Sequence, residues 1–209
     1  LPTAPAPRGR GRANGRLPAM TSDPGETTRL LDRLRAGDPE AAEAVYVRLY
    51  EDLRRIAHRV FASQRKGHTL EPTALVHEAW VKIAGADSAA SWKDSAHALA
   101  VAAKAMRQVL ANHARDRAAL KRGGGVFRER VTISGVAGAG EGREVDAVAL
   151  HEALDHLSAL DARQGQIAEM RLFGGLTTEQ IATLLGVAPR TVELDWSMAK
   201  RELSRALGG

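Results

Sequence analysis

The chain has 209 residues, of which 44% are hydrophobic but only 4% are aromatic, and it contains no cysteine. The absence of cysteine excludes disulfide bonds and cysteine-ligated zinc, and it fits a reducing cytoplasm. No apolar run approaches the roughly 18–20 residues that a membrane-spanning helix needs. We therefore expect a cytoplasmic protein with an aliphatic core, mostly helical because the chain is rich in alanine and leucine and has few β-branched runs.

The formal net charge is +5, and the positive charge is concentrated in two segments. Residues 1–20 contain four arginines and no acid, while residues 101–125 contain six Lys or Arg and one Asp. Such segments are candidates for binding a polyanion. The first segment has Pro and Gly but no apolar periodicity, which predicts disorder. It is either a genuine basic arm or sequence upstream of the true start at Met20.

Residues 27–122 have the apolar periodicity of several helices. Asp38 followed by Pro39 is the pattern of a helix N-cap and first helical residue. Apolar residues then recur every three or four positions, at Ala42, Val45, Leu49, Leu53, Ile56 and Val60. Further helices are predicted from Pro72 to Gly85 and from about Ser95 to Lys121.

Residues 123–145 contain seven glycines, a composition that predicts a flexible linker. Within this segment, "VFRERVTI" (residues 126–133) could form a short strand. The sequence offers it no evident partner strand, so we assign it to the linker. The helical pattern resumes in "AVALHEALDHLSAL", which begins at Ala147.

The stretch from Gly175 to Leu203 predicts two helices joined by a tight turn. Thr177 and Gln180 match a capping box at the start of the first helix. Gly186 stands where the turn needs a left-handed residue, and Pro189 suits the first turn of the second helix. The second helix has one apolar stripe, made of Val192, Trp196, Ala199, Leu203 and Ala206.

The other face of this last helix is mostly polar and basic. It carries Arg190, Thr191, Glu193, Leu194, Ser197, Lys200 and Arg201. A DNA-recognition helix presents polar side chains near its N-terminus to base edges, with basic residues for phosphates. The pattern favours a DNA-reading helix-turn-helix, and a plain helical hairpin that closes a core is the alternative.

Three segments in this order resemble the extracytoplasmic-function (ECF) group of the sigma-70 family of bacterial RNA polymerase initiation factors. They are "ALVHEAWVKIA", "AMRQVLANHARDRAALKRGG" and "LDARQGQIAEMRLFGGLTTEQIATLLGVAPRTVELDWSMAKREL". The resemblance covers residues 27–207. It implies an all-α fold of two small helical domains joined by a flexible Gly-rich linker, the C-terminal one a helix-turn-helix of the winged-helix-like sigma region 4 type.

The resemblance divides the chain into four parts. These are a disordered basic N-terminal tail (1–26), a region 2-like helical domain (27–122), the flexible linker (123–145) and a region 4-like helix-turn-helix domain (146–209). It implies a factor that binds core RNA polymerase, directs it to promoters with −35 and −10 elements and assists melting. Promoter DNA and core RNA polymerase are the implied partners, and an anti-sigma protein is a further candidate.

The resemblance also implies three sets of site residues. Leu75, His77, Glu78, Trp80 and Lys82 would bind polymerase. Trp92, Lys104, Arg107, Asn112, His113, Arg115 and Arg117 would bind the −10 element, with a flipped base held near the loop 86–94. The polar face of the last helix would read the −35 element, through Arg190, Thr191, Glu193, Leu194, Ser197, Lys200 and Arg201.

The chain departs from the usual family pattern at two places. Family members carry an Asp-Leu-x-Gln-Glu-like pattern in the polymerase-binding helix, where this chain has Ala74 for the acid and His77 for the glutamine. Glu193 and Asp195 stand where many relatives have basic residues. Glu193 could accept a hydrogen bond from a cytosine amino group, and the partner bases of both acids are open.

Other chemistry finds little support in the sequence. The histidines of "HEALDH", His151 and His156, are five positions apart rather than the four of a zinc-protease helix. There is no nucleophile elbow and no phosphate-binding loop, so we expect no catalytic residues, no metal, no cofactor and no small-molecule substrate. Two alternatives remain, which are a helix-turn-helix regulator acting without polymerase and a helical protein-interaction module.

Overall fold

The computed structural model describes residues 24–61, 70–83, 91–120, 129–133 and 143–208. The predicted N-terminal tail up to residue 23, and parts of the predicted linker and of the loop 86–94, lie outside these ranges. None of the helices within the described ranges has both the length and the apolar composition that a membrane span requires.

The N-terminal half is a set of helices that bury apolar side chains against one another. They are α1 (Pro24–Arg35), α2 (Pro39–Val60), α3 (Pro72–Ile83) and α5 (Ser95–Leu120). Helix α1 starts at Pro24, three residues earlier than the predicted domain boundary at 27. Asp38 caps α2 as predicted, because its side chain accepts a hydrogen bond of 3.0 Å from the backbone N–H of Glu40.

The C-terminal half contains the predicted helical hairpin and the helices that support it. They are α6 (Ala147–Leu160), α7 (Ala162–Glu169), the π-helical turn η1 (Met170–Gly174), α8 (Thr178–Leu185) and α9 (Pro189–Ala206). Asp146 caps α6 and Asp161 caps α7 through their side chains. Backbone hydrogen bonds to the carboxylate, first of all from Gln164, lower the pKa of Asp161.

Two short antiparallel strands lie in the segment predicted to be linker, and the second extends one residue beyond it, to Asp146. Strand β1 (Arg130–Ile133) pairs with β2 (Arg143–Asp146), so that Val131 lies opposite Val145. Both valines are buried in the hydrophobic core. The prediction that "VFRERVTI" has no partner strand is therefore wrong. The partner "REVD" is short and polar, so its role depends on packing and not on a local pattern.

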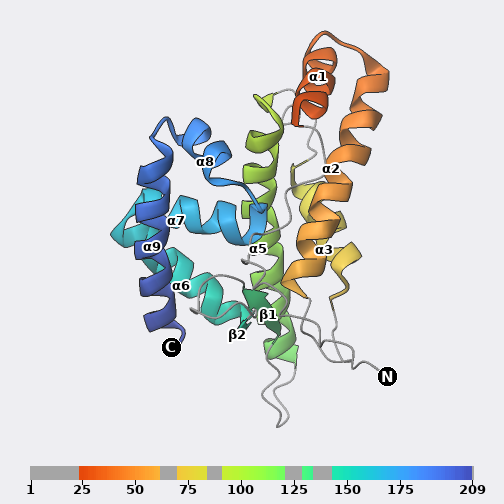
Figure 1. Cartoon of the computed structure of the whole chain (residues 1–209). Helices are drawn as coiled ribbons and strands as arrows, with labels where there is room; N and C mark the ends of the chain where they lie inside the picture. Colours follow the sequence, from red (N-terminus) through yellow and green to blue (C-terminus); the bar gives the residue numbers. More distant parts are fainter. Residues whose placement is uncertain (1–23, 62–69, 84–90, 121–128, 134–142, 209) are drawn as a thin grey trace, which may run out of the picture.

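Helix α5 lies between the two groups of helices, with α1 to α3 on one side and α6 to α9 on the other (Figure 1). Buried side chains from both halves form one continuous core, including Met106 of α5, Leu154 of α6 and Phe173 of η1. A Cβ atom added at Gly174 would lie 3.4 Å from the Cβ of Ala103. The two predicted domains are thus packed against each other through α5.

Candidate nucleic-acid interface

Local signals fix both ends of α8, the first helix of the hairpin. The Thr177 hydroxyl accepts from the backbone N–H of Gln180 at 3.3 Å, and the Thr177 N–H donates to the Gln180 side chain at 2.9 Å. Gly186 ends α8 in the left-handed conformation, with φ of 66°. The predicted capping box and the predicted turn glycine are both confirmed, so the sequence itself sets the start of α8 and the angle into α9.

Helix α9 rests on the rest of the C-terminal half through its apolar stripe. Val192, Trp196, Ala199 and Leu203 are buried as predicted. The prediction is wrong for Ala206, which is exposed, because it is the last residue of the helix. This packing turns the opposite face of α9 toward solvent.

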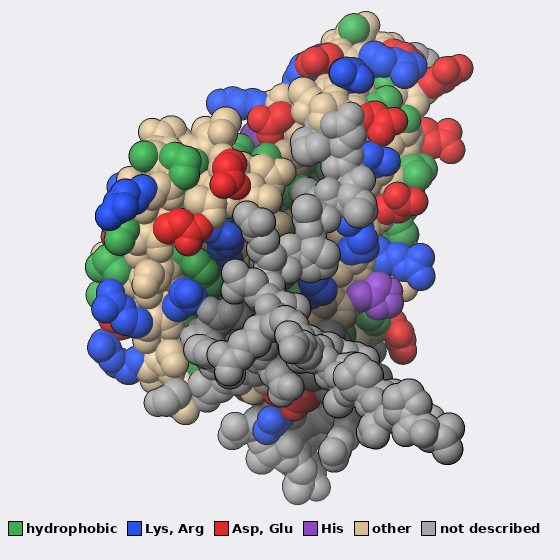
Figure 2. All heavy atoms as spheres, in the orientation of Figure 1, with side chains coloured by type: hydrophobic (Ala, Val, Ile, Leu, Met, Phe, Trp, Pro, Cys, Tyr) green, Lys and Arg blue, Asp and Glu red, His purple; other side chains and the backbone are tan. Residues whose placement is uncertain are grey.

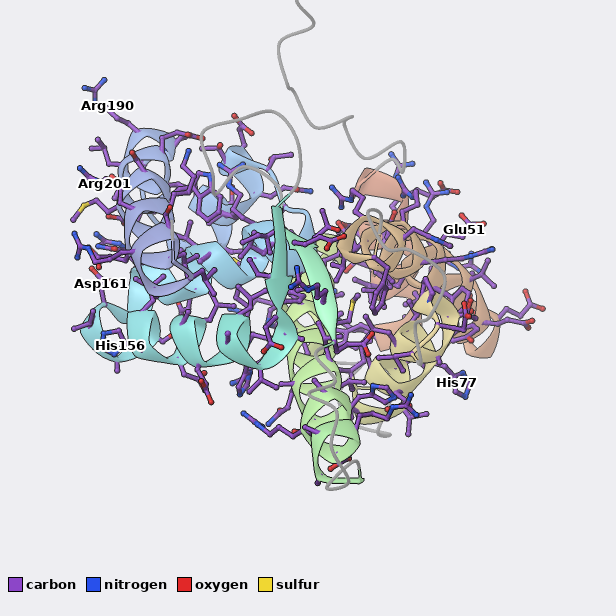
Figure 3. The ribbon with its side chains drawn as sticks, turned by 90° about the horizontal axis from the view of Figure 1, so that it is seen from below. Glu51, His77, His156, Asp161, Arg190 and Arg201 are labelled. Carbon is purple, nitrogen blue, oxygen red and sulfur yellow. The ribbon has the colours of Figure 1, made fainter. Side chains whose placement is uncertain are left out.

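The exposed face of α9 combines basic and hydrophobic side chains, which follow one another along the outer edge of the molecule (Figure 2). Arg190, Leu194, Ser197 and Arg201 are all exposed there. Arg190 and Arg201 point away from the body of the protein (Figure 3). The remaining predicted residues lie toward the sides of this face. Thr191 is half-buried, as is Lys200, whose Nζ lies 5.6 Å from the centroid of the Trp196 ring.

Two of the three acids of α9, Glu193 and Asp195, have partners in neighbouring elements. Arg171 of η1 donates to the Glu193 carboxylate at 2.9 Å, and the Thr178 hydroxyl donates to the same oxygen. Asp195 is only 6% exposed and accepts a hydrogen bond of 2.6 Å from Arg163 Nε. This contact raises the pKa of the Arg163 guanidinium. Both carboxylates therefore join α9 to neighbouring elements.

Part of the basic surface of α5 is covered by the C-terminal half. Arg107 Nε lies 2.8 Å from a carboxylate oxygen of Glu169, and Arg107 Nη1 lies 3.0 Å from a carboxylate oxygen of Asp155. Its side chain is only 13% exposed. Burial raises the pKa of the Glu169 carboxyl, while the positive charges of Arg107 and Lys104 oppose that rise. Arg107 thus joins α5 to α6 and α7.

The other residues predicted for the −10 element do not form one surface. Lys104, Asn112 and Arg115 are exposed on α5. His113 and Arg117 are half-buried, and the helical repeat places them on the opposite side of α5 from Lys104 and Arg115.

Trp92 lies in the core rather than on the surface. It is 1% exposed, and its ring centroid lies 6.0 Å from that of Trp80 in an edge-to-face arrangement. Trp80 in turn contacts Tyr46 at 4.7 Å between centroids. In this structure the Trp92 ring is therefore unavailable for stacking on a base. Trp92 is therefore part of the hydrophobic core, contrary to its predicted place on the −10-binding surface.

A helix-turn-helix with a basic face thus follows a basic helix in one chain. The family model described as ECF sigma factor matches residues 24–209. The chain belongs to the ECF sigma factor family. Comparison with curated proteins and with solved structures gave no significant match.

In this sigma factor, α3, the helix predicted to bind polymerase, exposes mainly polar side chains of the predicted set. His77, Glu78 and Lys82 of α3 are exposed, whereas Leu75 is fully buried and Trp80 is half-buried. Leu75 is therefore part of the core here, and only the polar side chains of the predicted set are fully open to a partner. His77 lies near the edge of the molecule opposite Arg190 and Arg201 (Figure 3).

Among the described residues of this sigma factor, no three or more His, Cys, Asp or Glu side chains come together in a group that could hold a metal ion. His151 lies 3.3 Å from the Asp155 carboxylate, one turn along α6. Burial lowers the pKa of His151, and Asp155 opposes that effect. His151 thus belongs to the contact between α5 and α6 that Arg107 also makes.

Proposed function

We propose that this sigma factor binds core RNA polymerase, directs it to promoters with −35 and −10 elements and assists melting of the −10 region. It acts in the cytoplasm and has no catalytic activity of its own. The exposed basic face of α9, built on a capped helix-turn-helix in a chain of this family, supports the proposal most strongly.

The −35 element is read by α9 in the major groove. Arg190 near the N-terminus of α9 reaches base edges, where an arginine can bind guanine with two hydrogen bonds. Arg201, three turns further along, meets a phosphate. The N-terminal end of the helix adds a favourable interaction with the DNA backbone through its dipole.

The −10 strand follows the exposed side chains of α5. Lys104 and Arg115 contact its phosphates, and Asn112 lies between them. Flipping one base out of the stack costs a few kcal/mol, which contacts between that base and the protein offset. Arg107 cannot reach a phosphate while Glu169 and Asp155 hold it, so the two halves of the protein separate when the promoter strand binds. Polymerase, which binds the polar face of α3, stabilises the separated arrangement.

Transcription in vitro with purified core RNA polymerase from the same bacterium tests this proposal. Genomic fragments serve as templates, because the promoter is unidentified. We expect defined start sites that require both the sigma factor and the core enzyme. A repressor-like regulator would instead bind duplex tightly without polymerase. If no fragment is transcribed above the level of core enzyme alone, the proposal is rejected.

A further inference from the structure

Two large apolar side chains are exposed one turn apart on the outer face of α9. Leu194 is 57% exposed and Met198 is 44% exposed. Residues four positions apart in a helix lie on the same face. Large apolar side chains in contact with water are unfavourable, so a pair of them on a reading helix indicates a surface that is covered in a complex.

The surroundings of this pair favour a polyanion as the covering partner. Arg190 and Arg201 lie on the same outer face and are exposed. Each acid of α9 has a basic partner, which offsets its repulsion of a phosphate. Asp195 is buried against Arg163 and Glu193 binds Arg171. The third acid, Glu202, pairs with Arg205 at 2.9 Å. An apolar pair within a basic face suits duplex DNA, whose phosphates attract the arginines, better than an uncharged apolar protein surface.

Duplex DNA offers an apolar group in the major groove. The C5-methyl group of thymine projects there, and it is the group that apolar side chains contact. We propose that Leu194 and Met198 contact thymine methyl groups, and so make the −35 element of this sigma factor rich in thymine at the positions they face. The inference rests on the proposed function and deepens it by naming a base and the two residues that select it.

The two residues differ in their expected contribution. Leu194 lies one turn nearer the N-terminus of α9, which is the end that a recognition helix presents to the bases. Met198 also contacts Gln164 of α7, whose amide nitrogen lies 4.0 Å from its sulfur. Leu194 is therefore expected to give the larger part of the thymine preference.

Binding of the reconstituted holoenzyme to a random duplex library tests this inference. The enriched duplex is then made with deoxyuridine in place of each thymine in turn, which removes only the methyl group. For at least one −35 position we expect affinity to fall about fourfold, because burial of one methyl-sized group has about that effect on an equilibrium. The Leu194→Ala variant loses this preference for thymine, and Leu194→Met retains most of it.

The matched control is Leu160→Ala, which removes the same side chain from a position that is 63% exposed at the end of α6. It keeps the thymine preference. An enriched duplex that binds equally well with deoxyuridine, or a preference that survives in Leu194→Ala, overturns the inference and leaves the proposed function standing. If the wild-type holoenzyme enriches no duplex at all, the proposed function fails and the inference fails with it.

Discussion

Two of the three acids of α9, Glu193 and Asp195, illustrate how a residue's partner decides its role. The family resemblance places Glu193 and Asp195 where many relatives carry basic residues, and the sequence leaves the partner bases of both open. Their contacts suggest a different role. Glu193 joins α9 to Arg171 and Thr178, and Asp195 joins α9 to Arg163. These contacts hold α9 against its neighbours, and Arg190 and Arg201 remain exposed on its outer face.

A substitution at Glu193 separates base reading from this structural role. Glu193→Gln weakens the contact with Arg171, whose side chain is only 14% exposed. We expect the free energy of unfolding to fall by about 1 kcal/mol, the typical net value of one hydrogen bond. The duplex sequence that the holoenzyme selects should stay the same. Urea denaturation measures the first effect, and library selection measures the second. A changed base at one −35 position would instead make Glu193 a reader.

Residue-scale interactions of this kind were beyond sequence reasoning for a physical reason. Asp195 and Arg163 are 32 positions apart, and nothing local to either one indicates the other. Gly165 is similar, because a Cβ atom there would lie 2.8 Å from the Cα of Ser158 on the neighbouring helix α6. Glycine is needed there for the close approach of two helices. That requirement exists only once the helices are packed.

At the scale of elements, the hairpin of α8 and α9 was the most predictable part of the fold. Its signals act within a few residues, since the capping box spans Thr177 to Gln180 and the turn needs one left-handed glycine, Gly186. The strand pair β1–β2 was not predictable, because its second strand has only four residues and no apolar alternation. Elements with local signals can be identified from sequence, and those formed by pairing across a glycine-rich segment cannot.

The capping box gives a prediction at this scale. Thr177→Ala removes the side-chain acceptor for the backbone N–H of Gln180 and exposes the first turn of α8 to fraying. We expect the free energy of unfolding to fall by about 1 kcal/mol, as measured by urea denaturation.

Thr183→Ala in the same helix serves as the control for that prediction. Its hydroxyl donates to the carbonyl of Glu179 within the helix and it is exposed, so its loss should change the free energy of unfolding by less than about 0.5 kcal/mol. Equal effects of the two threonine substitutions would show that the cap does not set the start of α8.

At the scale of the whole molecule, the packing of the two halves was not evident from the sequence. A glycine-rich segment predicts a flexible linker, and a flexible linker does not indicate whether the two domains that it joins pack against each other. Here α5 is shared, because its apolar side chains enter a core common to both halves and Arg107 is paired with two acids of the C-terminal half. The basic helix proposed to meet the promoter strand is thus partly neutralised within the protein itself.

This contact between the halves gives a pH-dependent prediction. The Glu169 carboxyl has an ordinary pKa of 4.5 in the unfolded chain, and burial raises it in the folded protein. The Glu169 carboxyl therefore stays protonated to higher pH in the folded state than in the unfolded state. In that window the wild type loses stability as the pH rises above about 4.5, until the raised pKa is passed. The Glu169→Gln variant lacks this titration.

Wild type and the Glu169→Gln variant should be compared by urea denaturation from about pH 4 to about pH 8. We expect the free energy of unfolding of the wild type to fall relative to that of the variant as the pH rises, and then to stay at a constant difference. Glu43→Gln, at an exposed position of α2 far along the chain from this contact, is the matched control. A wild type that gains stability over the variant with rising pH would mean that Arg107 outweighs burial at Glu169. The ion pair between the halves would then be a stabilising clasp, rather than a contact whose acid is unfavourably buried and which a promoter strand can readily displace.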